Sequence, residues 1–284
     1  MKISSLVFLL SISFVLLGCA QGYDTSEENY EYLVTIETPY GEMKAICHNE
    51  TPLHKERFLS LAEEGRFDST IFHRVINNFM IQGGDLQTKP NKESEPATIP
   101  AEFVPEYFHK KGALAAARQG DQVNPKRKSS GSQFYIVDGE VQTEKMITVD
   151  QQKLAKGIQH LFEIGKLGYL RRDLDSIYLT RNQKAYTECM LDAADTVQAL
   201  MGTEVYKEIP AERIEAYTTV GGSPHLDDEY TVFGQVIDGL DVIDKIAEVR
   251  TLRGDVPLEP IHISMSVEKV KKKKITKEYG YAFD

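Results

Sequence analysis

Apolar and polar residues alternate over several short runs of the chain, a pattern typical of β-strands with one buried face. Runs of this kind occupy residues 32–36, 42–47, 113–117, 133–137, 231–236 and 261–267. The first two flank a Pro-Tyr-Gly turn and predict a β-hairpin. The run at 113–117 is almost all alanine, which indicates that a ligand or another backbone comes close to it. Polar stretches at 85–100 and 119–130 predict surface loops.

Two shorter segments show helical features instead. Thr51 and Pro52 suit the N-cap and the first position of a helix, and Gly65 suits its end. One apolar face between them is formed by Phe58, Leu61 and Ala62. Residues 240–247 predict a second helix. Many strands with two helices favour a mainly β fold, a closed antiparallel barrel capped by the helices.

Residues 141–217 depart from this pattern, and structureless loops of such length are uncommon in compact domains. One helical stripe comprises Leu154, Ile158, Leu161 and Ile164, and a longer one comprises Tyr186, Met190, Ala193, Val197 and Leu200. Pro210 predicts the start of a third, short helix. We therefore expect a helical hairpin or three-helix lobe inserted into the barrel. It could be a packing lobe, or a surface that selects a partner or substrate.

The most informative segment is residues 72–85, FHRVINNFMIQGGD. Two apolar strand-like runs flank an Asn-Asn pair, which is a turn signal. Arg74 lies within the first run and Gln82 within the second, although arginine is rarely fully buried without a partner. A guanidinium held against an apolar surface indicates a binding groove rather than only a core.

This segment resembles the signature of the cyclophilins, a family of peptidyl-prolyl cis-trans isomerases: Phe-His-Arg, a short turn, Phe-Met, then Gln-Gly-Gly-Asp. Two further blocks occur in the family's order. The first comprises GALAAAR at 112–118 and GSQFYI at 131–136, and the second comprises PHLD at 224–227 and YTVFGQV at 230–236. The chain is identified as a member of this family with a helical insertion, where the family usually needs only a short connection.

The resemblance implies a division of the chain and a set of site residues. Residues 31–140 and 218–270 would form the cyclophilin-like barrel around the insertion. Catalytic roles are implied for Arg74, Phe79, Met80 and Gln82. Substrate-binding roles are implied for Ala117, Arg118, Gln133, Phe134, Tyr135, His225, Leu226 and Tyr230.

The chemistry of prolyl isomerisation explains these residue types. Rotation about an X–Pro bond meets a barrier of about 18–20 kcal/mol, because the amide loses its resonance. A catalyst needs a pocket for the proline ring, a donor aimed at the nitrogen lone pair, and contacts to the flanking backbone. By resemblance Arg74 is the donor, and Gln82 contacts the substrate backbone and helps to hold Arg74. The ring pocket would be lined by Phe79, Met80, Tyr135 and Leu226.

Four of these positions depart from the family's usual pattern. Arg118 replaces a frequent Asn, which questions the backbone contact made there, although its main-chain groups can still serve. Tyr135 replaces a common Phe, and Tyr230 replaces a frequent His at the pocket rim. His225 stands where drug-sensitive members have a Trp that donates a hydrogen bond to cyclosporin. Weak cyclosporin binding is therefore expected.

The N-terminus has the pattern of a targeting segment. Lys2 precedes a short apolar run that ends in Leu-Leu-Gly-Cys at 16–19. The run is too short to span a bilayer comfortably and resembles a bacterial lipobox, in which Cys19 is lipidated and becomes the mature N-terminus. We expect a signal peptide at 1–18, an acidic tether at 19–30, and a lipid anchor at the cell envelope, periplasm-facing or surface-exposed. An ordinary secretory signal is the alternative.

Composition sets further limits. The formal charge of −10 argues against a nucleic-acid partner, because that class needs a basic face. Residues 271–284 are rich in lysine and predict a solvated basic tail, with attraction to anionic lipid as the alternative. Cys47 and Cys189 lie in different modules, and spacing alone cannot pair them. We find no metal-ligand spacing and no phosphate loop, so no cofactor is expected.

Two functions fit these patterns. The first is a prolyl isomerase that assists the folding of exported proteins at the envelope, with proline-containing polypeptides as its clients. The second is a non-catalytic module that holds proline segments while the helical lobe engages a partner protein. The joint presence of Arg74, Phe79, Met80 and Gln82 favours catalysis. A lobe packed across the groove would favour the binding module.

Overall fold

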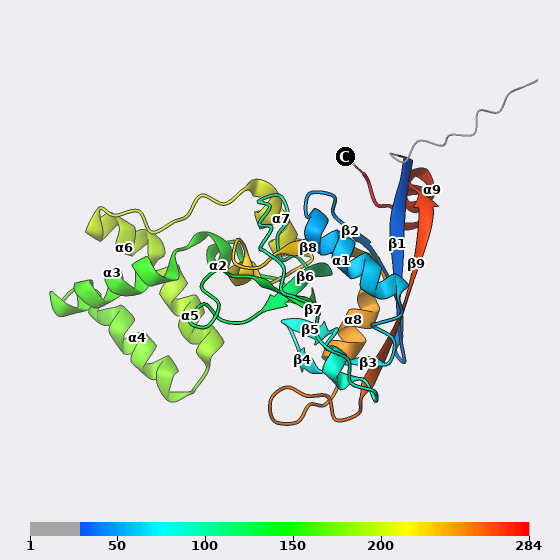
Figure 1. Cartoon of the computed structure of the whole chain (residues 1–284). Helices are drawn as coiled ribbons and strands as arrows, with labels where there is room; N and C mark the ends of the chain where they lie inside the picture. Colours follow the sequence, from blue (N-terminus) through cyan, green and yellow to red (C-terminus); the bar gives the residue numbers. More distant parts are fainter. Residues whose placement is uncertain (1–28, 284) are drawn as a thin grey trace, which may run out of the picture.

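A computed structural model describes residues 29–283, and within this range nine strands form one antiparallel sheet (Figure 1). The order is β3-β9-β1-β2-β8-β6-β7-β5-β4. The strands are β1 Tyr30–Thr38, β2 Gly41–Cys47, β3 Thr70–Phe72, β4 Arg74–Ile76, β5 Met80–Gly83, β6 Ala113–Arg118, β7 Ser129–Val137, β8 Val232–Asp238 and β9 Ile261–Lys271. Only His73 separates the two edge strands, β3 and β4, along the chain. The sheet therefore curls into a nearly closed barrel, and the predicted mainly β fold is confirmed.

Two helices, α1 (Pro52–Glu63) and α8 (Leu240–Ala247), cover the barrel interior. Pro52 occupies the first turn of α1 after Thr51, and Gly65 follows the helix in the left-handed region (φ +67°), as the sequence predicts. The apolar faces of both helices join the inward side chains of the strands in one core. Its members include Phe58, Phe72, Phe134, Ile136, Ile243 and Ile246.

Both faces of β6 are buried, which explains its small residues. Leu114 and Ala116 point into the barrel core. Ala113, Ala115 and Ala117 lie on the opposite face, where larger neighbours cover them. Because successive side chains of a strand alternate between faces, a bulky residue at these positions would push against the outer layer. That outer layer contains the candidate site.

The insertion forms a helical lobe beside the barrel (Figure 1), as predicted. Its helices are α2 Glu144–Thr148, α3 Gln151–Glu163, α4 Gly168–Leu179, α5 Gln183–Asp192, α6 Ala194–Met201 and α7 Ala211–Thr219. The lobe has a core of its own, which includes Leu154, Ile158, Leu161, Leu170, Leu174, Leu191 and Val197. Its outer part begins and ends where Val149 and Tyr206 form an isolated antiparallel bridge. Residues 150–205 therefore leave the rest of the chain and rejoin it at the same place.

The lobe differs from its prediction in three details. Helix α4 was not predicted, because its buried side chains form only a narrow leucine stripe. The single long stripe at 186–200 is in fact two helices, α5 and α6. Ile164 and Leu200 are exposed (53% and 44%) rather than buried. Both lie at helix ends, where helical spacing no longer sets the direction of a side chain.

The C-terminal segment also corrects the sequence prediction. Instead of a solvated basic tail, residues 272–279 form helix α9 (Lys272–Tyr279). Ile275 is fully buried and packs with Leu33, Ile46 and Val270 on the outer side of β1, β2 and β9. The sequence analysis missed this buried residue because lysines lie before and after it. Lys273 and Lys274 remain exposed, as a charged surface requires.

Candidate active site

The β4–β5 hairpin places Arg74 and Gln82 side by side. They are cross-strand partners, so their side chains share one face of the sheet. The turn between the strands contains Asn78 in the left-handed region (φ +61°), which Asn adopts more readily than most residues. The Asn78 N–H donates a hydrogen bond to Asp138 Oδ2 at 2.7 Å. The predicted Asn-Asn turn thus sets the register that brings the two polar side chains together.

A pocket of about 100 Å³ lies beside this pair on the outer face of the barrel. Its lining consists of Arg74, Phe79, Met80, Gln82, Ala117, Arg118, Tyr135, Leu226 and Tyr230. Met80, Tyr135 and Leu226 are 2%, 4% and 9% exposed, so the walls are apolar and fixed by packing. All nine residues were predicted from the sequence. None of them belongs to the lobe, which therefore does not close the pocket.

Tyr135 is held by a buried hydrogen-bond chain that the sequence did not reveal. Its hydroxyl lies 2.9 Å from His109 Nε2, and His109 Nδ1 lies 3.0 Å from Asp227 Oδ1. Because a carboxylate only accepts, His109 donates from Nδ1, and its Nε2 is left to accept from Tyr135. Burial raises the pKa of Tyr135 well above its usual value, so the phenol stays protonated. The one available sequence signal was Tyr135 itself, since a buried tyrosine hydroxyl needs a partner.

Arg74 has a second partner on a distant loop. Its Nε donates to Asp255 Oδ2 at 3.3 Å, and both side chains are partly exposed (42% and 44%). The Asp255 carbonyl also accepts from the Val75 N–H at 2.8 Å, which ties this loop to β4. The contact leaves the terminal nitrogens of the guanidinium free of any ion pair within residues 29–283. No sequence pattern links Asp255 to Arg74, because the two residues lie 181 positions apart in the chain.

Arg118 is the departure from the family pattern with the clearest structural outcome. Its guanidinium carbon lies 4.4 Å from the centre of the Tyr230 ring, a cation–π contact. Arg118 Nε donates to the Glu229 carbonyl at 2.9 Å, and the side chain is only 5% exposed. These contacts fix Arg118 and Tyr230 together as one wall of the pocket. The two unusual residues therefore compensate for one another structurally.

Three predicted site residues do not line the pocket. Gln133 lies behind it and accepts a hydrogen bond from Gln82 Nε2 at 3.3 Å. The assignment of Phe134 to the substrate site is wrong, because Phe134 points into the barrel and packs edge-on against Phe67 at 5.6 Å. Strand alternation explains this, since Phe134 and Tyr135 must face opposite sides of β7. His225 lies beside Phe79, with the two rings tilted and their centres 5.4 Å apart, and it lines a second cavity.

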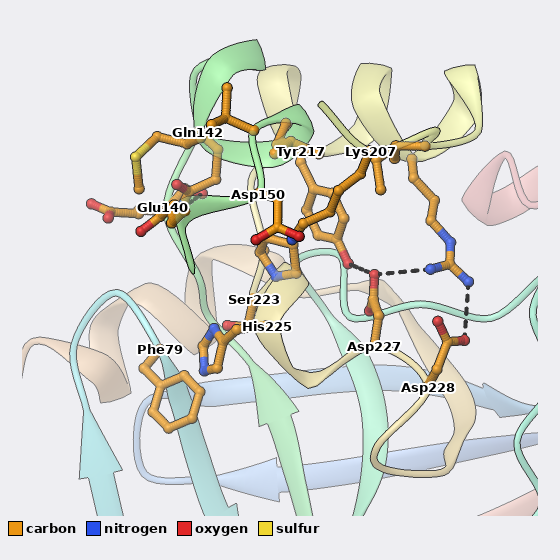
Figure 2. Close-up of a pocket in the computed structure, with 18 of the residues that line it drawn as sticks. Phe79, Glu140, Gln142, Asp150, Lys207, Tyr217, Ser223, His225, Asp227 and Asp228 are labelled. Atoms are coloured by element: carbon orange, nitrogen blue, oxygen red, sulfur yellow. Dashed lines mark hydrogen bonds and ion pairs between the residues drawn. The ribbon is translucent and has the colours of Figure 1, made fainter. Parts of the chain in front are cut away.

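That second cavity is a cleft of about 940 Å³ between the lobe and the barrel (Figure 2). Phe79 and His225 stand at its barrel side, and Asp150 and Lys207 lie on the lobe side. Burial lowers the pKa of His225, which keeps its ring neutral near pH 7. The cleft is far larger than the pocket, yet Arg74 and Gln82 are not part of it.

The remaining predictions concern cysteines, metals and the membrane. Cys47 and Cys189 are both free, and burial raises the pKa of the Cys47 thiol to about 12. Between residues 29 and 283 we find no cluster of His, Cys, Asp and Glu suited to a metal ion. Over the same range, no helix has the length and apolar character needed to cross a bilayer. The predicted signal peptide and Cys19 lie outside the described residues.

Comparison with known proteins agrees with the geometry of the pocket. The family model of the cyclophilin type peptidyl-prolyl cis-trans isomerases matches residues 33–167 and 204–267. The chain belongs to this family. The unmatched residues 168–203 comprise α4, α5 and α6, so this part of the lobe lies outside the family pattern.

Two curated relatives and one solved structure extend the comparison. A Staphylococcus aureus (strain USA300) protein, provisionally named a peptidyl-prolyl cis-trans isomerase, is 30% identical over 255 residues, covering 84% of this chain and 98% of that protein. A Streptococcus pyogenes serotype M6 protein, provisionally named a bifunctional phosphatase/peptidyl-prolyl cis-trans isomerase, is 30% identical over 235 residues. This chain spans only 37% of its length. The crystal structure of a Cryptosporidium parvum cyclophilin type isomerase shares the fold, with a TM-score of 0.50 and 20% identity over 84% of this chain and 98% of that one.

Proposed function

We propose that this protein catalyses cis–trans isomerisation of X–Pro bonds in exported polypeptides at the bacterial cell envelope. The observation that carries the catalytic part is the presence of the partly exposed Arg74 in the lining of a small apolar pocket, together with Met80 and Tyr135. A pocket without a charged donor would bind proline but would not lower the barrier. The open pocket, uncovered by the lobe, gives no support to the alternative of a purely binding module.

In the proposed mechanism, the pocket holds the proline ring while the preceding peptide group rotates. The nitrogen becomes pyramidal as resonance is lost, and its lone pair becomes a hydrogen-bond acceptor only in the transition state. The Arg74 guanidinium, which keeps its charge in proteins, donates to that lone pair. Such a charge-assisted bond contributes about 1.5–3 kcal/mol, or about ten- to 150-fold in rate. Gln82, bonded to Gln133, is placed to hold the substrate backbone and Arg74.

The first experiment measures isomerisation of a proline peptide by the fragment from residue 29 onward. We expect the fragment to accelerate the reaction far above its spontaneous rate. Gln82→Ala should reduce kcat/KM several-fold, because it removes the side chain placed to hold the substrate backbone beside Arg74. A fragment that is folded but leaves the spontaneous rate unchanged would overturn the catalytic proposal.

The envelope location rests on the lipobox-like Leu-Leu-Gly-Cys at residues 16–19. A lipid on Cys19 would hold the protein at a membrane surface. We expect Cys19→Ser to move the protein from the membrane fraction to the soluble fraction of bacterial cells. Cys189→Ser is the matched control, because it removes a thiol from the lobe, and it should leave the distribution unchanged. A Cys19→Ser protein that stays with the membranes would contradict the lipid anchor.

A further inference from the structure

The cleft between the lobe and the barrel has no role in the mechanism above. It is bounded on one side by the hairpin turn and the segment Pro224–Leu226, and on the other by α2 and the start of α3 (Figure 2). Its volume of about 940 Å³ lies at the upper end of the range of ligand sites, about 300–1,000 Å³. Apolar side chains form much of its wall, among them Phe79, Met146, Ile147, Ile209 and Tyr217.

The cleft adjoins the proline pocket at one shared residue, Phe79. Phe79 lines both cavities, and the ring of His225, which lines the cleft, lies tilted against it with ring centres 5.4 Å apart. An extended chain advances about 3.3–3.6 Å per residue. Because the width of one side chain, Phe79, separates the two cavities, a polypeptide whose proline occupies the pocket can reach the cleft within about two to four residues. One end of a bound client would then continue into the cleft.

The charges of the cleft indicate which client residues it favours. Four carboxylates line it, Glu140, Asp150, Asp227 and Asp228, against the two cations Lys207 and Arg213. Arg213 is already engaged by Asp227 at 3.3 Å and by Asp228 at 3.4 Å. The pKa of Asp150 is lowered mainly by hydrogen bonds from the first turn of α3. The positive charge of Lys207 lowers it further, so this lysine is already paired electrostatically with Asp150.

Glu140 differs from the other three carboxylates of the cleft, because its charge is not paired in the part of the chain that the structure describes. Its side chain is exposed to the cleft, and within residues 29–283 no ion pair or hydrogen bond engages its carboxylate. With His225 neutral, the lining carries a net negative charge. A basic side chain of the client would meet Glu140 without having to break an existing pair.

We propose that the cleft binds the client segment on one side of the proline and selects a Lys or Arg two to four residues away. This inference rests on the proposed isomerase function, since the pocket fixes where the segment begins. The lobe then contributes to substrate specificity, whereas the barrel carries the catalytic groups.

The test compares peptides with one central proline. A reference peptide has alanine at all flanking positions, and two series place Lys or Glu two, three or four residues before or after the proline. For the wild-type fragment, we expect kcat/KM for Lys to exceed that for Glu by about three- to fivefold on one side only. The difference should shrink as salt is raised.

Two variants on opposite walls of the cleft change the charge in opposite directions. Glu140→Lys should remove or reverse the preference, whereas Gln152→Glu should increase it. Asp175→Lys is the matched control: it makes the same charge change as Glu140→Lys on an exposed position of α4 outside the cleft. It should keep the wild-type preference. All variants should turn over the reference peptide at the wild-type rate.

The outcomes separate this inference from the function on which it rests. Equal rates for Lys and Glu peptides on both sides, with normal turnover of the reference peptide, would overturn the cleft proposal alone. A preference unchanged in Glu140→Lys, or lost equally in Asp175→Lys, would also overturn it. A preference that depends on enzyme concentration would place a second copy of the chain in the cleft instead. No turnover of the reference peptide would overturn both proposals.

Discussion

Asp227 offers the sharpest test of how the lobe and the barrel are joined. Its carboxylate accepts from the His109 N–H at 2.9 Å and from His109 Nδ1 at 3.0 Å through Oδ1. Through Oδ2 it accepts from Tyr217 at 2.7 Å and from Arg213 at 3.3 Å (Figure 2). The Asp227 side chain is 9% exposed, and that of Arg213 is 11% exposed. Four donors thus converge on one nearly buried charge.

The substitution Asp227→Asn keeps the shape of this side chain and removes its charge. The new amide has one accepting oxygen, so its NH₂ group must face either the two His109 donors or the Tyr217 and Arg213 donors. Each donor left without an acceptor costs about 1–3 kcal/mol. Breaking a buried ion pair typically costs about 3–5 kcal/mol, because the remaining charge is uncompensated. Arg213 retains the Pro105 carbonyl at 2.5 Å, so we expect a loss of about 3 kcal/mol.

The assay is urea unfolding of the fragment from residue 29, followed by circular dichroism because the chain has no tryptophan. Asp228→Asn is the matched control. Asp228 also pairs with Arg213, at 3.4 Å, but its side chain is 64% exposed, so its loss should cost less than about 1 kcal/mol. We expect Asp227→Asn to lower kcat/KM as well, since Leu226 precedes it and Tyr135 depends on His109. If Asp227→Asn unfolds within about 0.5 kcal/mol of the wild type, the proposed network does not stabilise the fold.

Three further predictions follow from other contacts. Asp255→Asn should reduce kcat about two- to fivefold without changing KM, because the ion pair that orients Arg74 is lost. An unchanged kcat would show that Asp255 does not orient Arg74 for catalysis. Replacing residues 150–205 by a short glycine turn should leave a soluble fragment that isomerises the reference peptide, since Val149 and Tyr206 are already paired; an insoluble or inactive product would show that the lobe supports the barrel. His225→Trp should tighten cyclosporin inhibition about five- to 150-fold, and no gain would refute the position assigned to His225.

The barrel was predictable from the sequence because its strands and its two capping helices have strong local patterns. Residues 113–117 and 240–247 lie within one residue of β6 and α8. Prediction from local sequence patterns failed where a tertiary contact determines the secondary structure. Ile275, with Tyr279 beside it, anchors α9, and the lysines around Ile275 gave the opposite signal.

The candidate site also contains residues that local motifs indicated and residues that only the tertiary structure revealed. Nine of the twelve residues that the motifs indicated line one pocket, and the hairpin register places two of them, Arg74 and Gln82, side by side. Phe134 was misassigned because a motif lists neighbouring residues without their alternation across the strand. His109, Asp227 and Asp255 were missed because their contacts join parts of the chain more than a hundred residues apart. The charge and volume of the cleft likewise exist only once the lobe is placed beside the barrel.

The central claim is that Arg74 acts on the transition state of proline isomerisation rather than on binding. The most direct measurement is kcat/KM for the reference peptide, with the peptide Kd measured in parallel, for the wild-type fragment, Arg74→Lys and Arg74→Ala. We predict a loss of at least about tenfold in kcat/KM for Arg74→Ala, a smaller loss for Arg74→Lys, and little change in Kd or in the urea midpoint. Unchanged turnover in Arg74→Ala, or a loss of turnover fully matched by a loss of affinity, would contradict the account.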